Sequence, residues 1–111
     1  MARLPTHFII DRKKFYLKYW TQEQANKVQC DGEFDTDNAV ITINKDLKPK
    51  DKLITVIHEL LHFLVWYNGL KLSDKSEEKY VDLFSTQLIG ILLNPKNKDL
   101  KNLIIKILKD N

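Results

Sequence analysis

The segment from Leu53 to Trp66 constrains the fold of this chain more than any other, because it is apolar at nearly every position. A helix that is apolar on almost every side has to be covered on almost every side, so the segment predicts a buried central helix. Pro49 suits the first turn of that helix, and Asn68 and Gly69 provide its end. The rest of the chain has to supply the elements that cover it.

The residues before this helix favour short strands. Three segments rich in β-branched and aromatic residues are predicted as strands: residues 7–10, 15–20 and 39–43. The break at residues 11–14 has the length of a tight hairpin, whereas the polar residues at 31–32 and 35–38 are typical of loops. Residues 21–28 fit a short helix, with Thr21 as its N-cap and Gln24 completing a capping box.

Two further helices are predicted in the C-terminal part. The first begins at Ser73 or Asp74 and ends before Asn94, and the second spans residues 97–109. The second forms one apolar stripe from Leu100, Leu103, Ile104, Ile107 and Leu108. We expect this stripe to dock on the core, with a membrane-surface or partner-binding helix as the alternative. The predicted fold class is therefore α+β, a small antiparallel sheet followed by three helices, in one domain of residues 1–111.

The distribution of charge argues against a nucleic-acid partner. The chain has 18 Lys and Arg against 15 Asp and Glu, and the segment from Asn94 to the end, with five Lys and two Asp, supplies the whole excess of three. Arg3 and Arg12 are the only arginines, too few for a typical phosphate-gripping face. The single cysteine, Cys30, excludes an internal disulfide and a thiolate zinc cluster. With no apolar run of membrane-spanning length, we expect a cytoplasmic protein without a membrane partner, and the sequence defines no oligomeric state.

The residues His58-Glu59-Leu60-Leu61-His62 form an H-E-x-x-H motif in the middle of the apolar helix. Four residues turn a helix by about 400°, so His58 and His62 lie on one face and can both bind a single Zn²⁺. Glu59 flanks that position without ligating the metal, where a general base for water is needed. The alternative interpretation, without a metal, is a pair of hydrogen-bonded core histidines, but buried polar groups of this kind are energetically costly without partners.

Two histidines leave a catalytic zinc site one protein ligand short. Val65 and Asn68 occupy the places of the Gly and third His in the extended motif, and His7 lies near the N-terminus. We therefore expect a carboxylate from the next helix, with Asp74, Glu77, Glu78 and Asp82 as candidates. Helical phase favours Glu77 and Glu78 almost equally, with a slight preference for Glu78.

The motif and the helix from Glu78 to Leu88 together resemble the ImmA/IrrE-type zinc metallopeptidases and their short phage-encoded relatives, which are gluzincin-like. In that family the second helix reads roughly E-x-x-A-N-x-F-A-x-x-L, and its Glu is the third zinc ligand. Glu78, Phe84 and Leu88 fall on the Glu, Phe and Leu of this pattern. The resemblance thus favours Glu78 over Glu77 as the ligand.

The resemblance implies a single zincin-like metallopeptidase domain with the motif on its central helix. It implies a Zn²⁺ cofactor held by His58, His62 and Glu78, and a zinc endopeptidase that hydrolyses peptide bonds of a protein substrate through a metal-activated water, with Glu59 as the catalytic general base. The alternative is a zinc-binding regulatory protein of a phage or mobile element that does not catalyse a reaction. If the strand at residues 39–44 is a sheet edge, it also provides a place for an extended substrate to pair.

Overall fold

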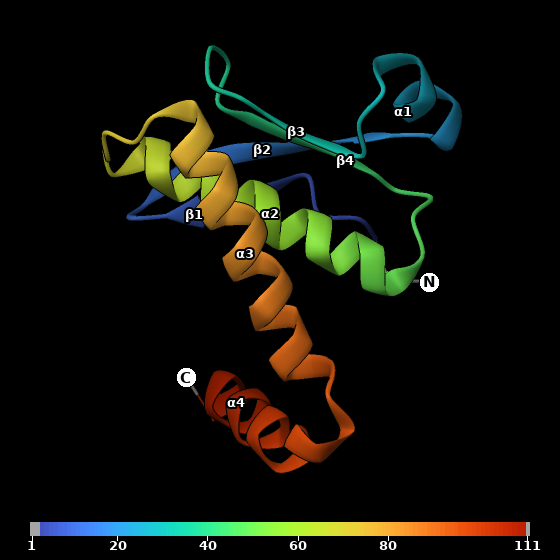
Figure 1. The fold of residues 1–111 in the computed structure, drawn as a ribbon, viewed down its shortest axis with the longest axis vertical. Helices are drawn as coiled ribbons and strands as arrows, with labels where there is room; N and C mark the ends of the chain where they lie inside the picture. Colours follow the sequence, from blue (N-terminus) through green and yellow to red (C-terminus); the bar gives the residue numbers. More distant parts are fainter. Residues whose placement is uncertain (1–2, 111) are drawn as a thin grey trace.

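The computed structural model describes residues 3–110 and shows an α+β fold, as predicted (Figure 1). A four-stranded sheet comes first in the chain, with one short helix inserted, and the longer helices follow. The elements are β1 (His7–Ile10), β2 (Lys13–Trp20), α1 (Gln22–Val28), β3 (Gly32–Asp35), β4 (Val40–Asn44), α2 (Pro49–Tyr67), α3 (Asp74–Leu93), the 3₁₀ turn η1 (Pro95–Asn97) and α4 (Lys98–Asp110). None of the described helices is both long enough and apolar enough to cross a membrane.

The sheet has the strand order β1-β2-β4-β3 and is mixed, so the predicted antiparallel sheet is wrong in one pairing. β1 and β2 form one antiparallel hairpin, and β3 and β4 form another. The two hairpins join through β2 and β4, which run parallel. Parallel neighbours need a crossover connection, and here α1 and β3 provide it between the two strands.

The capping residues of α1 behave as the sequence predicts. The side chain of Thr21 accepts a hydrogen bond from the Gln24 amide, and the Gln24 side chain accepts one from the Thr21 amide. The hairpin turn between β1 and β2 consists of Asp11 and Arg12, both with positive φ, at 50° and 67°. That left-handed geometry matches the twist of the two strands, which explains why a two-residue loop suffices.

β3 was not expected from the sequence, because residues 31–32 and 35–38 favour loops. Phe34 is its one large apolar residue, and its ring packs edge-on against Phe63 of α2. Residues 36–39, polar except for Ala39, form the loop of the β3–β4 hairpin, in which Asp35 pairs with Val40. As a result β4 lies inside the sheet, so the expectation that residues 39–44 form a substrate-pairing edge is wrong; β3 is the edge strand on that side.

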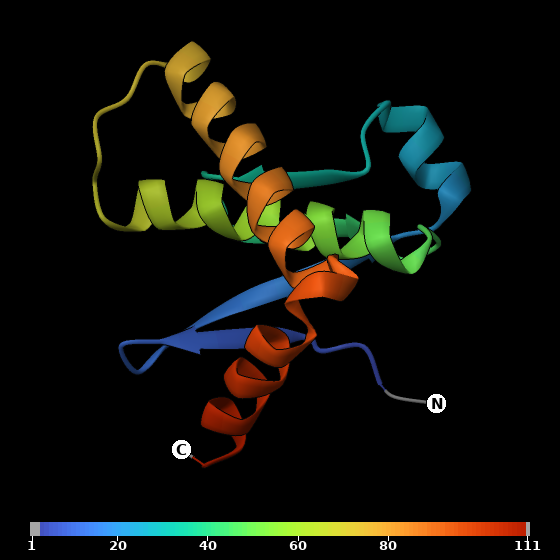
Figure 2. The ribbon, with the colours of Figure 1, turned by 60° about the horizontal axis from the view of Figure 1, so that its bottom comes forward.

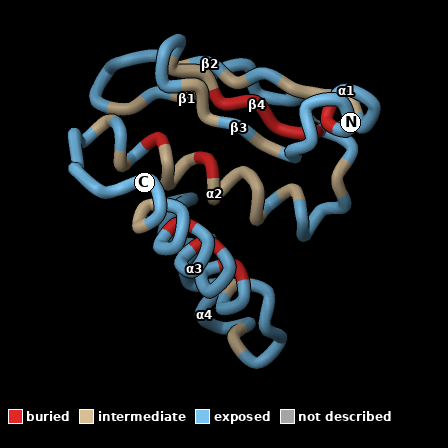
Figure 3. Tube along the Cα trace, turned by 45° about the horizontal axis from the view of Figure 1, so that its top comes forward, coloured by how far each residue is buried: buried red, intermediate tan, exposed pale blue. Residues whose placement is uncertain are grey.

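The core lies between one face of the sheet and α2. Ile41 and Ile43 of β4 and Phe63 of α2 are fully buried, and further aromatic rings surround Phe63. On α2 only Glu59 and Phe63 are buried, whereas Leu64 and Trp66 are more than a third exposed. The helix is therefore covered by the sheet on one side and by α3 on another, and not on nearly every side as predicted (Figure 3).

α3 crosses α2 with its small and medium-sized residues inward. Val81, Ser85 and Ile89 are its buried residues, and Ser85 satisfies its hydroxyl by donating to the Val81 carbonyl. A small side chain at this position allows the two helices to approach closely. The N-cap of α3 is Ser73, whose hydroxyl accepts from the Ser76 amide, and Asp74 is the first residue of the helix.

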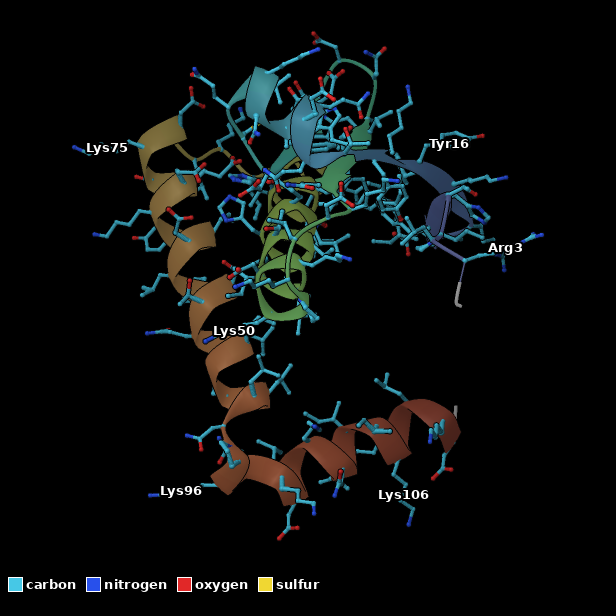
Figure 4. The ribbon with its side chains drawn as sticks, turned by 90° about the vertical axis from the view of Figure 1, so that its right-hand side faces the viewer. Arg3, Tyr16, Lys50, Lys75, Lys96 and Lys106 are labelled. Atoms are coloured by element: carbon cyan, nitrogen blue, oxygen red, sulfur yellow. The ribbon has the colours of Figure 1, made fainter. Side chains whose placement is uncertain are left out.

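α4 does not dock on the core, so the predicted role of its apolar stripe is wrong. All its residues are exposed, and its contacts are with α3 and η1 (Figures 2 and 3). The turn at η1 sets its direction: the Asn94 side chain accepts from the Lys96 amide, and the Asn97 side chain donates to the Ile91 carbonyl. After this bend α4 lies apart from α2 and the sheet (Figure 4), and the sheet–helix core does not cover the stripe.

Gly32 is needed for the close approach of β3 to α2. A Cβ atom there would lie 2.6 Å from Thr55 Cγ2 and 3.0 Å from Glu59 Oε2. We expect Gly32→Ala to lower the free energy of unfolding by about 1–3 kcal/mol, measured by urea denaturation. Gly90→Ala is the matched control: nothing lies within 4 Å of its Cβ position, and alanine in a helix should stabilise by about 0.5–1 kcal/mol.

A Thr55→Ser background tests the cause of that loss. Serine keeps the hydroxyl, which donates to the Asp51 carbonyl, and removes the methyl group that clashes. The penalty of Gly32→Ala should be smaller in this background. An unchanged penalty would show that the contact with Thr55 is not its source.

Candidate metal centre

The candidate site lies where α3 crosses α2 (Figure 1). α2 provides His58, Glu59 and His62, separated by one and three residues, so that they line one side of the helix. The first turns of α3 provide acidic residues that meet this side: Glu77, Glu78 and Asp82. The helix pair therefore brings the motif and the predicted carboxylate together, although they are far apart in the sequence.

Three potential ligand side chains converge on one point. His58 Nε2 and His62 Nε2 are 3.1 Å apart, and the Glu78 carboxylate reaches both: Oε1 lies 3.1 Å from His58 Nε2, and Oε2 lies 3.1 Å from His62 Nε2. Within residues 3–110, this group of His58, His62 and Glu78 is the one that can hold a metal ion. These are the three residues predicted as ligands.

The other ring nitrogen of each histidine has a carboxylate partner. His62 Nδ1 lies 2.6 Å from Glu77 Oε2, and His58 Nδ1 lies 3.1 Å from Asp82 Oδ1. An ionised carboxylate only accepts hydrogen bonds, so both Nδ1 atoms have to carry the proton. In a neutral imidazole this leaves Nε2 with a lone pair. Glu77 and Asp82 therefore fix the tautomer in which the Nε2 lone pairs of both histidines are directed at the same point.

This donor set fits a zinc ion. Two imidazole lone pairs and a carboxylate directed at one point repel one another unless a cation or protons lie between them. With ligand bonds of about 2.0–2.2 Å, neighbouring ligand atoms of a tetrahedral site are roughly 3.3–3.6 Å apart, close to the 3.1 Å separations found here. Two histidines and a glutamate leave a fourth position open, as catalytic zinc sites do.

Glu59 lies next to this point without joining it. Its side chain is nearly buried, with 6% of the residue exposed. Burial is the main cause that raises the pKa of Glu59 to about 7; the charge of His62 opposes this shift, and the charge of Glu78 adds to it. The Glu59 carboxyl is thus held near the candidate ligands by a protein environment that favours its protonated form in the absence of a metal.

Two cavities open on either side of Glu59. One, of about 300 Å³, is lined by His58, Glu59 and Glu78 together with Cys30, Asp31 and Gly32 before and at the start of β3. The other, of about 250 Å³, is lined by Glu59, His62, Glu77 and Glu78 together with Phe34 and Thr36. Glu59 and Glu78 belong to both, so the candidate metal position lies between the two cavities, alongside the edge strand β3.

A buried polar network fixes the segment that leads into β3. Asn44 is fully buried at the end of β4, and its side-chain amide donates to Asp31 Oδ1 and to Gln22 Oε1. Its backbone amide donates to the Asp31 carbonyl. Asn44 therefore holds Asp31, and with it Gly32, at a defined distance from α2.

Two acidic residues of this site have a role that the sequence does not predict. Glu77 and Asp82 are candidates for the third ligand, whereas in the structure they contact the Nδ1 atoms of His62 and His58. The i, i+4 spacing of Glu78 and Asp82 is a signal that could have revealed a shared face. His7 lies on β1 with Thr6 as its partner, outside the site.

Comparison of the chain with protein-family models, with curated proteins and with solved structures finds no match.

The raised pKa of Glu59 predicts a pH-dependent stability in the metal-free protein. Because the folded protein binds this proton more tightly than the unfolded chain, the contribution is full below pH 4.5 and is lost as pH rises to about 7. Glu59→Gln removes this loss. Above neutral pH the free energy of unfolding of the variant should therefore exceed that of the wild type by about 3 kcal/mol, and below pH 4.5 the two should differ little. Urea denaturation with a chelator, across pH, measures the difference.

Glu23→Gln is the control for that experiment. Glu23 lies on α1 with 84% of its side chain exposed, so its replacement should leave the pH profile of stability unchanged. A constant offset between Glu59→Gln and the wild type at all pH values would contradict the assigned cause.

Proposed function

We propose that this chain is a zinc-dependent endopeptidase, with His58, His62 and Glu78 as the metal ligands and Glu59 as the general base. One observation carries the proposal. The Nε2 atoms of the two histidines and the carboxylate of Glu78 lie 3.1 Å from one another, and the nearly buried carboxyl of Glu59 lies beside them outside this ligand set. Structural zinc sites use four protein ligands, whereas three ligands and a free carboxylate are typical of metal-assisted hydrolysis.

When bound, Zn²⁺ supplies a Lewis acid that makes water acidic and polarises the carbonyl of a peptide bond. The residues of the chain then have distinct tasks. Glu59 takes up the proton of the attacking water on its carboxylate and later gives it to the leaving amine. Glu77 and Asp82 hold the rings of His62 and His58 in position through their Nδ1 atoms.

A peptide substrate would bind as an added strand on β3. β3 is the sheet edge beside the site, and both cavities next to Glu59 are lined in part by residues in or flanking it. An extended peptide paired with the free edge of β3 would pass Glu59 between the two cavities. Backbone hydrogen bonds give such binding affinity with little dependence on side chains, which supports a protein or peptide substrate.

The same arrangement supports assignment to the HExxH metallopeptidases of the zincin-like type, as a minimal member resembling the ImmA/IrrE proteins. The motif lies on α2, the third ligand comes from the following helix, and a sheet edge runs beside them. Glu78 rather than Glu77 reaches both Nε2 atoms, in agreement with the position that the resemblance gives to the ligand.

The ligand assignment predicts a graded loss of zinc affinity. Glu77→Ala and Asp82→Ala remove groups that orient a ligand, and each should weaken zinc binding by roughly 10–100-fold. Glu78→Ala removes a ligand itself and should weaken binding well beyond that range. Competition titration with a chromophoric chelator measures all three. Asp74→Ala, an exposed acid on the same helix, is the control and should leave affinity unchanged; equal losses for Glu77→Ala and Glu78→Ala would refute the assignment.

The role of Glu59 predicts that metal binding and turnover separate. Glu59→Gln should bind one zinc per chain, as the wild type does, while cleavage of an unfolded protein such as denatured casein falls by about 10²–10⁴-fold. Metal analysis and fragment mass spectrometry measure the two properties, with Glu23→Gln as the control. Cleavage that survives Glu59→Gln would exclude this base. A wild type that holds zinc but cleaves no peptide would instead favour the regulatory protein as the function.

A further inference from the structure

An apolar groove lies beside α2 and α3, separate from the two cavities at Glu59. It has a volume of about 410 Å³ and is lined by side chains of α2, of the α2–α3 connection and of α3. Its apolar lining includes Leu61, Leu64, Val65, Leu72, Tyr80 and Phe84. Phe84 stacks on Tyr80 and is 54% exposed. Glu77 is the one charged residue in this lining.

The apolar stripe of α4 is exposed on the same chain. Leu100, Leu103, Ile104 and Leu108 are spaced as one helix face, and between 37% and 69% of each residue is exposed. α4 extends apart from α2 and the sheet, and Lys106 points away from the rest of the molecule (Figure 4). The helix carries four Lys and two Asp, so its polar side is basic.

We propose that the groove receives α4 of a second copy of this chain. An amphipathic helix docks in an apolar groove through anchors spaced by three or four residues, which is the spacing of the stripe. Charge complementarity supports this occupant, because Glu77 is the one charged residue of the groove lining and Lys101 lies at the edge of the stripe, next to Leu108 on the helical wheel. One chain carries both the helix and the groove, so two copies related by a two-fold axis can bury both at once and form a closed dimer.

The bend at η1 explains why α4 does not fill the groove of its own chain. The contacts that fix η1 lie at the C-terminal end of α3, whereas the groove is formed along the N-terminal half of α3, from Glu77 to Phe84. A second copy brings its α4 from outside and needs no change at this turn. The dimer therefore forms without unfolding either chain.

Two single variants test the two halves of the contact by sedimentation velocity over a wide range of protein concentration. Leu103→Glu places a charge on the stripe, and Phe84→Glu places one in the groove; both residues are more than half exposed, so the fold does not depend on them. We expect each variant to weaken dimerisation at least about tenfold. Ile105→Glu is the matched control: it lies about 130° from the centre of the stripe and should dimerise as the wild type does.

A mixing experiment decides whether α4 occupies this groove. Leu103→Glu keeps an intact groove, and Phe84→Glu keeps an intact α4, so the mixture should form a heterodimer with one intact contact at concentrations where each variant alone is mostly monomeric. A wild type that stays monomeric at all concentrations would overturn the proposal. A dimer that persists in Phe84→Glu would also overturn it, because α4 would then bind elsewhere. A third contradicting result would be a monomeric wild type that binds vesicles of anionic phospholipid when Leu103→Glu does not, because the stripe would then bind a membrane surface. Circular dichroism confirms that each variant is folded, and the measurements are made on the metal-free protein and require no peptidase activity.

Discussion

The close approach of α3 to α2 is the constraint on which the site depends. Val81, Ser85 and Ile89 are the buried residues of α3, and the crossing of the two helices brings acidic groups of α3 against two histidines of α2. Carboxylates gathered around two histidines repel one another, and burial raises the cost of ionising Glu59. The packing energy of the helix pair has to hold this arrangement in the absence of a cation, and a bound cation would stabilise the folded state through the same residues.

The sheet contributes by fixing one strand rather than by enclosing the site. The buried side chain of Asn44 ties the end of β4 to Asp31, and the lack of a side chain at Gly32 lets β3 lie directly against Glu59. Phe34, two residues on, secures the same strand to Phe63 of the core. The edge strand is therefore anchored at both ends beside the candidate metal position, which the proposed pairing with an extended peptide requires.

The sequence was informative where a local pattern determines the structure. The helical bounds of α2, the capping box at Thr21 and the hairpin at residues 11–14 follow from side-chain periodicity and turn chemistry. Long-range choices could not be predicted in the same way. Nothing local in Gly32–Asp35 distinguishes an edge strand from a loop, because its pairing is set by β4 and its burial by Phe63. The stripe of α4 has the pattern of a docked helix, but the bend at η1 decides where it points. At the site, phase predicted a shared face for the ligands, whereas the contacts of Glu77 and Asp82 with the far ring nitrogens depend on how the helices cross.

Glu77 belongs to two neighbourhoods at once: its carboxylate holds His62, and its side chain forms part of the apolar groove. A helix bound in that groove would order Glu77, and this would alter how well His62 binds a metal ion. Thermodynamic reciprocity then requires occupancy of the ion position to alter the affinity of the groove for its helix by the same factor. Self-association and ion uptake would in that case be two readouts of a single coupled equilibrium, with one carboxylate as the link.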